Sequence, residues 1–142
     1  MRSKAPLALM EQVVMVLVFA LAAALCLRVF VFSDRMSERN KDIDHAVLLA
    51  QNTAELLKAC GGVEEAAAVA GGNIRQMMWS IYYDEDLNPV PDQASAHYVV
   101  DTLPINSGVE GLGKANIEVF RNDGNTGLFC ITVAWQEVNG NG

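Results

Sequence analysis

The sequence predicts an α+β protein in which a long N-terminal helix packs on a small antiparallel β-sheet. Three observations favour this fold class. The first is an apolar run over residues 7–32 that contains only two charges, Glu11 and Arg28. The second is a continuation that reaches residue 59 without proline or glycine. The third is a change, after residue 72, to segments rich in aromatic and β-branched residues, which are typical of strands.

The apolar run is long enough to cross a membrane. A helix rises about 1.5 Å per residue, so roughly 20 apolar residues span the ~30 Å hydrocarbon layer. Arg2 and Lys4 precede the run, and short basic flanks stay on the cytoplasmic side. We therefore expect a cytoplasmic basic leader over residues 1–6, a single transmembrane helix over residues 7–32 in the cell membrane, and an extracellular C-terminal domain.

Residues 33–60 are expected to continue this helix outside the membrane. One face of the continuation is apolar, because apolar residues recur there at spacings of three, four or seven. These residues are Met36, Ile43, Val47, Ala50, Ala54 and Leu57. Gly61 and Gly62 then end the helix, since glycine readily adopts the left-handed conformation found at helix ends. The apolar face is expected to pack on the sheet.

Residues 61–142 are expected to form a small acidic α+β outer domain. Alanine and glutamate at residues 63–70 predict a short helix, which Gly71 and Gly72 close. Four strands follow, over residues 77–83, 96–103, 115–121 and 128–136. The sequence NDGN at residues 122–125 favours a tight hairpin between the last two strands, which therefore pair antiparallel. The last strand is apolar on both faces, which predicts a central position.

The charge of the outer part excludes nucleic acid as a partner. Residues 59–142 carry three basic and eleven acidic side chains, a net charge of −8. A surface of this charge repels the phosphate backbone. It favours a solvated surface, with cation binding as the less favoured alternative.

The polar residues do not form a recognisable catalytic or cofactor motif. His45 and His97 are the only histidines, and neither has a second ligand at the spacing typical of a zinc site. No serine or cysteine lies in a nucleophile turn, and the phosphate-binding glycine-rich motif is missing. We therefore predict no enzyme activity, no cofactor and no metal site.

Two features of the outer domain leave alternatives open. Asp84, Glu85, Asp86 and Asp92 offer oxygen ligands to calcium, but their spacing differs from the helix-flanked calcium loop, which favours an acidic turn. Cys60 and Cys130 both lie in the part expected outside the cell. A disulfide between them requires a short distance that the sequence alone does not establish.

Glu11 is the most unusual residue of the apolar run. A carboxylate in the hydrocarbon layer is costly unless it finds a partner or becomes neutral. Because Glu11 lies near the cytoplasmic end of the run, it either reaches water at the interface or pairs with a cation.

The N-terminal segment resembles a known family. A basic leader, the run LALMEQVVMVLVFALAAALCL at residues 7–27 with glutamate as its fifth residue, a helical continuation and a small acidic β-rich domain are similar to type IV pilins and type II secretion pseudopilins, in their Gram-positive, minor-pilin-like form. In that family a prepilin peptidase cuts just before the apolar run, and the glutamate pairs with the terminal amine of a neighbouring subunit. The resemblance implies a pilin-like fold, processing between Pro6 and Leu7, and assembly through Leu7 and Glu11. It implies the membrane, other pilin-like subunits and a prepilin peptidase as partners.

The chain departs from the family pattern at the processing site. Pro6 stands where glycine is usual, and Leu7 stands where phenylalanine is usual. Proline restricts the backbone just before the cut. These differences favour a minor or accessory subunit over a major filament subunit.

Two other functions fit the same sequence. A signal-anchored protein would recognise an extracellular ligand without polymerising. A secreted protein would be released by cleavage before Asp34, although the apolar run is longer than the roughly 7–15 residues of a signal-peptide core. Glu11 separates assembly from simple anchoring, because its charge matters only if the chain polymerises.

Overall fold

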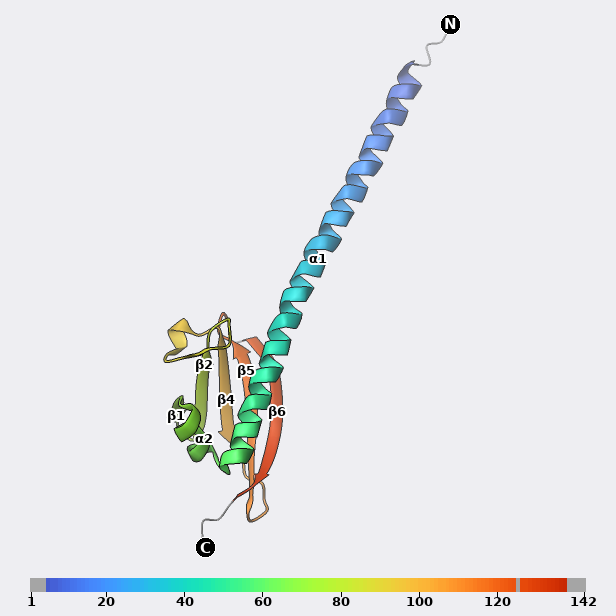
Figure 1. Cartoon of the computed structure of the whole chain (residues 1–142). Helices are drawn as coiled ribbons and strands as arrows, with labels where there is room; N and C mark the ends of the chain where they lie inside the picture. Colours follow the sequence, from blue (N-terminus) through green and yellow to red (C-terminus); the bar gives the residue numbers. More distant parts are fainter. Residues whose placement is uncertain (1–4, 125, 138–142) are drawn as a thin grey trace. The chain divides into compact units, whose positions relative to one another are not determined.

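The computed structural model describes residues 5–124 and 126–137 (Figure 1). The chain divides into two compact units, an N-terminal unit of Met1–Asn40 and a C-terminal unit of Lys41–Gly142. One helix, α1 (Ala5–Cys60), begins in the N-terminal unit and ends in the C-terminal unit. The long helix predicted from the sequence is therefore confirmed, with bounds within two residues of those expected.

The described part of the N-terminal unit is the first part of α1. Every residue from Pro6 to Asn40 is exposed, and the most apolar 18-residue window of the helix has no buried residue. The helix is long and apolar enough to cross a membrane. After Pro6 it contains neither proline nor glycine, the residues that most often kink helices.

The C-terminal unit contains the end of α1, a short helix α2 (Val63–Ala70) and one antiparallel sheet. The strands are β1 (Asn73–Arg75), β2 (Met78–Tyr83), β3 (Pro89–Val90), β4 (Tyr98–Pro104), β5 (Leu112–Arg121) and β6 (Thr126–Gln136), with a 3₁₀ helix, η1 (Gln93–Ser95), before β4. The strand order is β1-β2-β4-β5-β6, and β3 pairs with the end of β2. This sheet and the long helix confirm the predicted α+β fold class.

The core lies between one face of the sheet and the part of α1 from residue 41 onward (Figure 1). Trp79, Val100 and Ile117 are fully buried and come from β2, β4 and β5. They belong to one cluster with Leu49 and Leu57 of α1. Every second residue of β5 is buried, because successive side chains of a strand point to opposite faces of the sheet.

The buried face of α1 differs from the predicted stripe. Met36 is 55% exposed, and Ile43 and Val47 are only half-buried. The buried residues of α1 are Asp42, Ala46, Leu49, Ala50, Thr53, Ala54 and Leu57. Ala50, Ala54 and Leu57 of the predicted stripe are thus buried as expected. The helix also turns Asp42 and Thr53 toward the sheet, and a search for apolar side chains does not find these polar residues.

The predicted central position of the last strand is wrong. β6 pairs with β5 on one side and lies at the edge of the sheet, whereas β2, β4 and β5 are the inner strands. The antiparallel pairing of β5 with β6 is confirmed, and residue 125 of the predicted turn lies outside the described residues. β1 and β3 were not predicted, since strands of three and two residues are too short to show a period.

The cysteines of the C-terminal unit are separate. Cys60 is half-buried and packs against the core, whereas Cys130 is exposed on β6. Both are free thiols in the structure, so the disulfide that the sequence left open does not form here.

Candidate functional site

Glu11 lies on an exposed apolar surface of the N-terminal unit. Its neighbours on the helix surface include Leu7, Met10, Val14 and Met15. Leu7 and Glu11 are four residues apart, so they share one face of α1. The structure therefore places the two predicted assembly residues side by side on the helix, and Pro6 lies in its first turn.

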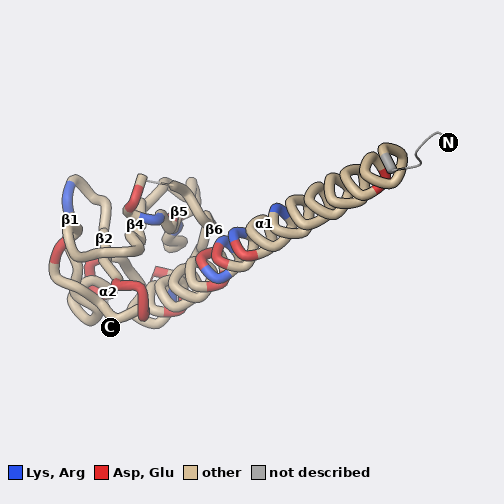
Figure 2. The backbone as a smooth tube through the Cα atoms, turned by 90° about the horizontal axis from the view of Figure 1, so that it is seen from above, with Lys and Arg blue, Asp and Glu red and all other residues tan. Residues whose placement is uncertain are grey.

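The carboxylate of Glu11 has no cationic partner within the described part of the chain. Figure 2 shows the tube of α1 without charge between Glu11 and Arg28. Seventeen positions at about 1.5 Å each separate these two residues by about 25 Å along the helix, too far for an ion pair. Arg28 therefore does not pair with Glu11, and the residues that the structure describes leave the carboxylate free for a cation outside them or for water at the interface.

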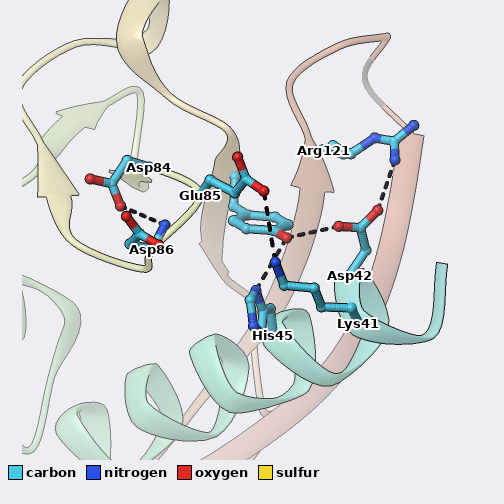
Figure 3. Close-up of polar contacts among 8 residues, drawn as sticks. Lys41, Asp42, His45, Asp84, Glu85, Asp86 and Arg121 are labelled. Carbon is cyan, nitrogen blue, oxygen red and sulfur yellow. Dashed lines mark hydrogen bonds and ion pairs between the residues drawn. The ribbon is translucent and has the colours of Figure 1, made fainter. Parts of the chain in front are cut away.

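A second polar site, which the sequence did not predict, lies in the C-terminal unit (Figure 3). The Tyr98 hydroxyl donates to Asp42 Oδ1 at 2.8 Å, and Arg121 Nη1 donates to Asp42 Oδ2 at 2.7 Å. Asp42 is on α1, while Tyr98 and Arg121 face each other in the register of β4 and β5. Asp42 and Tyr98 are buried, with 8% and 1% of their surface exposed. The site is therefore a polar lock between α1 and the sheet.

Contacts in and beside the polar lock change the pKa values of Asp123 and Tyr98. Arg121 Nη2 also donates to Asp123 Oδ2 at 2.6 Å, and this contact lowers the pKa of the Asp123 carboxyl below its ordinary value. Burial, followed by the hydrogen bond to Asp42, raises the pKa of the Tyr98 hydroxyl well above its ordinary range. Tyr98 thus remains a neutral donor and Asp42 its acceptor.

The two histidines flank Tyr98. His45 Nδ1 lies 3.3 Å from the Tyr98 hydroxyl oxygen, and the ring of His97 meets the Tyr98 ring edge-on with centroids 4.7 Å apart. Neither contact has the geometry of a zinc site, because such a site needs several nitrogen or sulfur ligands that converge on one point. The histidines therefore pack around the lock.

Two acidic residues between β2 and β4 accept hydrogen bonds within their own turns, whereas Glu85 lies 3.7 Å from Lys41 of α1 in an exposed ion pair. Asp84 Oδ1 accepts from the backbone N–H groups of Asp86 and Asn88 at 3.0 and 2.8 Å, and the Asn88 contact lowers the pKa of Asp84. Asp92 accepts from the Ser95 backbone and hydroxyl, at 3.0 and 2.8 Å. Within residues 5–124 and 126–137, no three acidic, histidine or cysteine side chains converge as metal ligands. Calcium binding by this loop gains no support.

Loss of the lock is expected to destabilise the C-terminal unit. Asp42→Ala leaves the buried Tyr98 hydroxyl without its acceptor, which costs about 1–3 kcal/mol in the free energy of unfolding. Urea unfolding of the full chain in detergent, followed by tryptophan emission, measures the effect. Asp44→Ala is the matched control, because Asp44 is an exposed acid two positions along the same helix. Equal midpoints for the two variants would contradict a stabilising role for the lock.

Comparison with known proteins finds no matching family model, no similar curated protein and no similar solved structure. The function must therefore be argued from the residues of the two sites. The polar lock is structural, since its groups bind one another. Glu11 has no cationic partner among residues 5–124 and 126–137 and is the better candidate for function.

Proposed function

We propose that this chain is a single-pass membrane subunit of a filament of the type IV pilus or type II secretion kind, similar to a minor pilin. It assembles through its N-terminal helix and displays its acidic C-terminal domain outside the cell. The observation that carries the proposal is Glu11, a carboxylate on an exposed apolar helix of membrane-spanning length that pairs with no cation in the part of the chain that the structure describes.

The exposed apolar surface supports a membrane location. Large apolar side chains such as Leu17, Phe19 and Phe30 are 59%, 77% and 74% exposed. Water around so many apolar side chains is unfavourable, so the segment requires lipid or other helices around it. The basic residues Arg2 and Lys4 before the segment favour a cytoplasmic N-terminus.

The chemistry of Glu11 supports assembly rather than anchoring alone. A carboxylate at the edge of the hydrocarbon layer is stabilised by a nearby cation in the same low-dielectric setting. If the chain is cut before Leu7, each copy gains a terminal amine four residues from its own Glu11. The amine of one subunit and the Glu11 carboxylate of the next then neutralise each other, which couples helix packing to subunit order.

N-terminal sequencing and intact mass of the protein from its native membrane test this proposal. A chain that begins at Leu7 is the expected result. A chain that begins at Asp34 would show a secreted protein and overturn the proposal. A chain that begins at Met1 or Arg2 would contradict prepilin processing and favour the signal-anchored protein that does not polymerise.

A further inference from the structure

β6 presents a free strand edge. It is the last strand in the order β1-β2-β4-β5-β6, and no other element in the described part of the chain pairs with its outer side. Exposed edges carry unpaired backbone N–H and C=O groups, which proteins commonly block with charged side chains, proline or short strand length. The strand TGLFCITVAWQ has 11 residues and contains neither a charged residue nor proline. Its backbone can therefore pair with an added strand.

The two faces of β6 beside this edge differ in chemistry. On one face, Phe129 and Ile131 pack against the core but are only half-buried. On the other face, Cys130 and Thr132 are small and exposed. Because side chains of a strand alternate between the faces of a sheet, an added strand places one set of its side chains against the apolar pair and the other set on the face of Cys130.

Two carboxylates lie on the sheet face that carries Cys130. Cys130 stands opposite Glu118 of β5, and Glu118 stands opposite Asp101 of β4. Like charges directly opposite on neighbouring strands repel each other. Their hydrogen-bond donors are neutral, the Asn116 amide at 2.9 Å from Glu118 and the Ser80 hydroxyl at 2.6 Å from Asp101. Since neither carboxylate pairs with a cation among the residues that the structure describes, this face favours an added positive charge.

An open pocket connects Glu118 with the strand edge. It has a volume of about 360 Å³ and is lined by Glu118, Phe120, Gly127, Leu128, Phe129 and Cys130. Aromatic rings attract a cation, and lysine and arginine pack their apolar stems on apolar side chains while their charged ends reach a carboxylate. An added strand lies about 10 Å from β5, two strand spacings away. A long basic side chain on it can therefore extend over the small Cys130 to Glu118.

We propose that β6 binds an extended basic segment of another protein as an additional strand, with arginine or lysine at alternate positions facing Glu118. Charge complementarity favours this partner. Residues 41–142 carry five basic and fourteen acidic side chains, a net charge of −9, which attracts a basic segment and repels a second copy of the domain. Backbone hydrogen bonds along β6 supply affinity, and the pocket supplies the preference for a basic side chain. This binding goes beyond the proposed assembly through α1 and does not depend on Glu11.

Peptide binding to the full chain in a neutral detergent tests the proposal. The probe is a blocked, fluorescein-labelled peptide of the sequence TVRVTVRVT, and fluorescence anisotropy measures its dissociation constant. We expect saturable binding of this peptide and at least several-fold weaker binding of its acidic counterpart, TVEVTVEVT. Equal affinity for the two peptides, or no binding of the basic one, would overturn the proposal.

A matched pair of variants separates the site from the overall charge of the domain. Glu118→Gln removes the carboxylate but keeps an oxygen that can accept from Asn116, and it should weaken binding of the basic peptide several-fold. Glu64→Gln, at an exposed position on α2, removes the same charge elsewhere and should leave the affinity nearly unchanged. Glu11→Gln should also leave it unchanged, so this binding and assembly through α1 can fail independently. Equal losses for Glu118→Gln and Glu64→Gln would contradict the assignment of the site.

Disulfide trapping tests whether the peptide pairs with β6 as a strand. In the full chain with Cys26→Ala and Cys60→Ala, Cys130 is the remaining cysteine. The peptide TVRVCVRVT carries its cysteine on the face of its arginines, whereas TVRCTVRVT carries it on the opposite face. Because directly opposite side chains on one face come within about 5 Å of each other, oxidation with copper phenanthroline should link the first peptide to Cys130 strongly and the second weakly. Equal linking would exclude strand pairing, and chains linked to each other through Cys130 in preference to the peptide would show a second copy at this edge instead.

Discussion

Glu11→Gln is expected to remove the chain from higher-order assemblies in its native membrane while leaving it inserted and folded. Glutamine keeps the size and polarity of the side chain but carries no charge, so only an ion pair is lost. The helix around it stays apolar and exposed, and the C-terminal unit does not contain Glu11. A large effect on assembly with no effect on insertion is therefore the signature of pairing with a cation on another subunit.

Chemical cross-linking of native membranes, read as the ladder of species above the monomer, measures this effect. Glu11→Asp keeps the charge on a shorter side chain and should restore part of the ladder. Gln12→Asn changes the adjacent polar residue without a change of charge and serves as the matched control. If Glu11→Gln gave the same ladder as the parent chain, Glu11 would be an interfacial residue of a plain anchor.

Trp79→Ala is expected to produce the largest loss of stability in the C-terminal unit. Trp79 is fully buried in β2, and replacing a buried tryptophan by alanine costs about 3–5 kcal/mol because it leaves a cavity. Its indole N–H also donates to the Gly71 carbonyl at 2.8 Å. Gly72 fits beside it only as glycine, with φ at +95° and the Ser80 carbonyl oxygen 2.6 Å from where a Cβ would stand.

Urea unfolding of the full chain in detergent, followed by emission from Trp135, measures this loss. Trp135 is 7% exposed, so its emission reports on the core. A loss of 3–5 kcal/mol is a large part of the roughly 5–15 kcal/mol of a typical domain. Val69→Ala, at a position 71% exposed on α2, is the control and should change stability by less than about 0.5 kcal/mol. An unchanged midpoint for Trp79→Ala would mean that the core tolerates the cavity.

The sequence predicted the elements of the fold more closely than their arrangement. α2 has the predicted bounds, and the four longer strands lie where β-branched and aromatic residues cluster. The edge position of β6 was not predicted. Phe129 and Ile131 are partly buried against the core on one face of the strand, whereas Cys130 and Ala134 are exposed on the other face. An apolar residue on an exposed edge looks the same in sequence as one in a central strand.

Of the two candidate sites, one could be predicted from the sequence and the other could not. Glu11 could be found from sequence, because a single carboxylate in an apolar run stands out locally. The polar lock could not, since Asp42 is 56 residues from Tyr98 and 79 residues from Arg121. One local signal was available: Asp42 lies one turn before the buried Ala46, at a helical spacing that places it on the sheet-facing side.

The distance along the chain between Asp42 and Arg121 determines the order in which parts of the C-terminal unit can form during synthesis. Neighbouring strands along the sheet follow one another in the chain, apart from the short β3, so each can pair as soon as the next is made. The contact of α1 with β5 forms later, because Arg121 is made 79 residues after Asp42. At about 5–20 residues per second, this delay is about 4–16 s. For that time the nascent helix exposes a face destined for the core, and a chaperone that shields it would act in this interval.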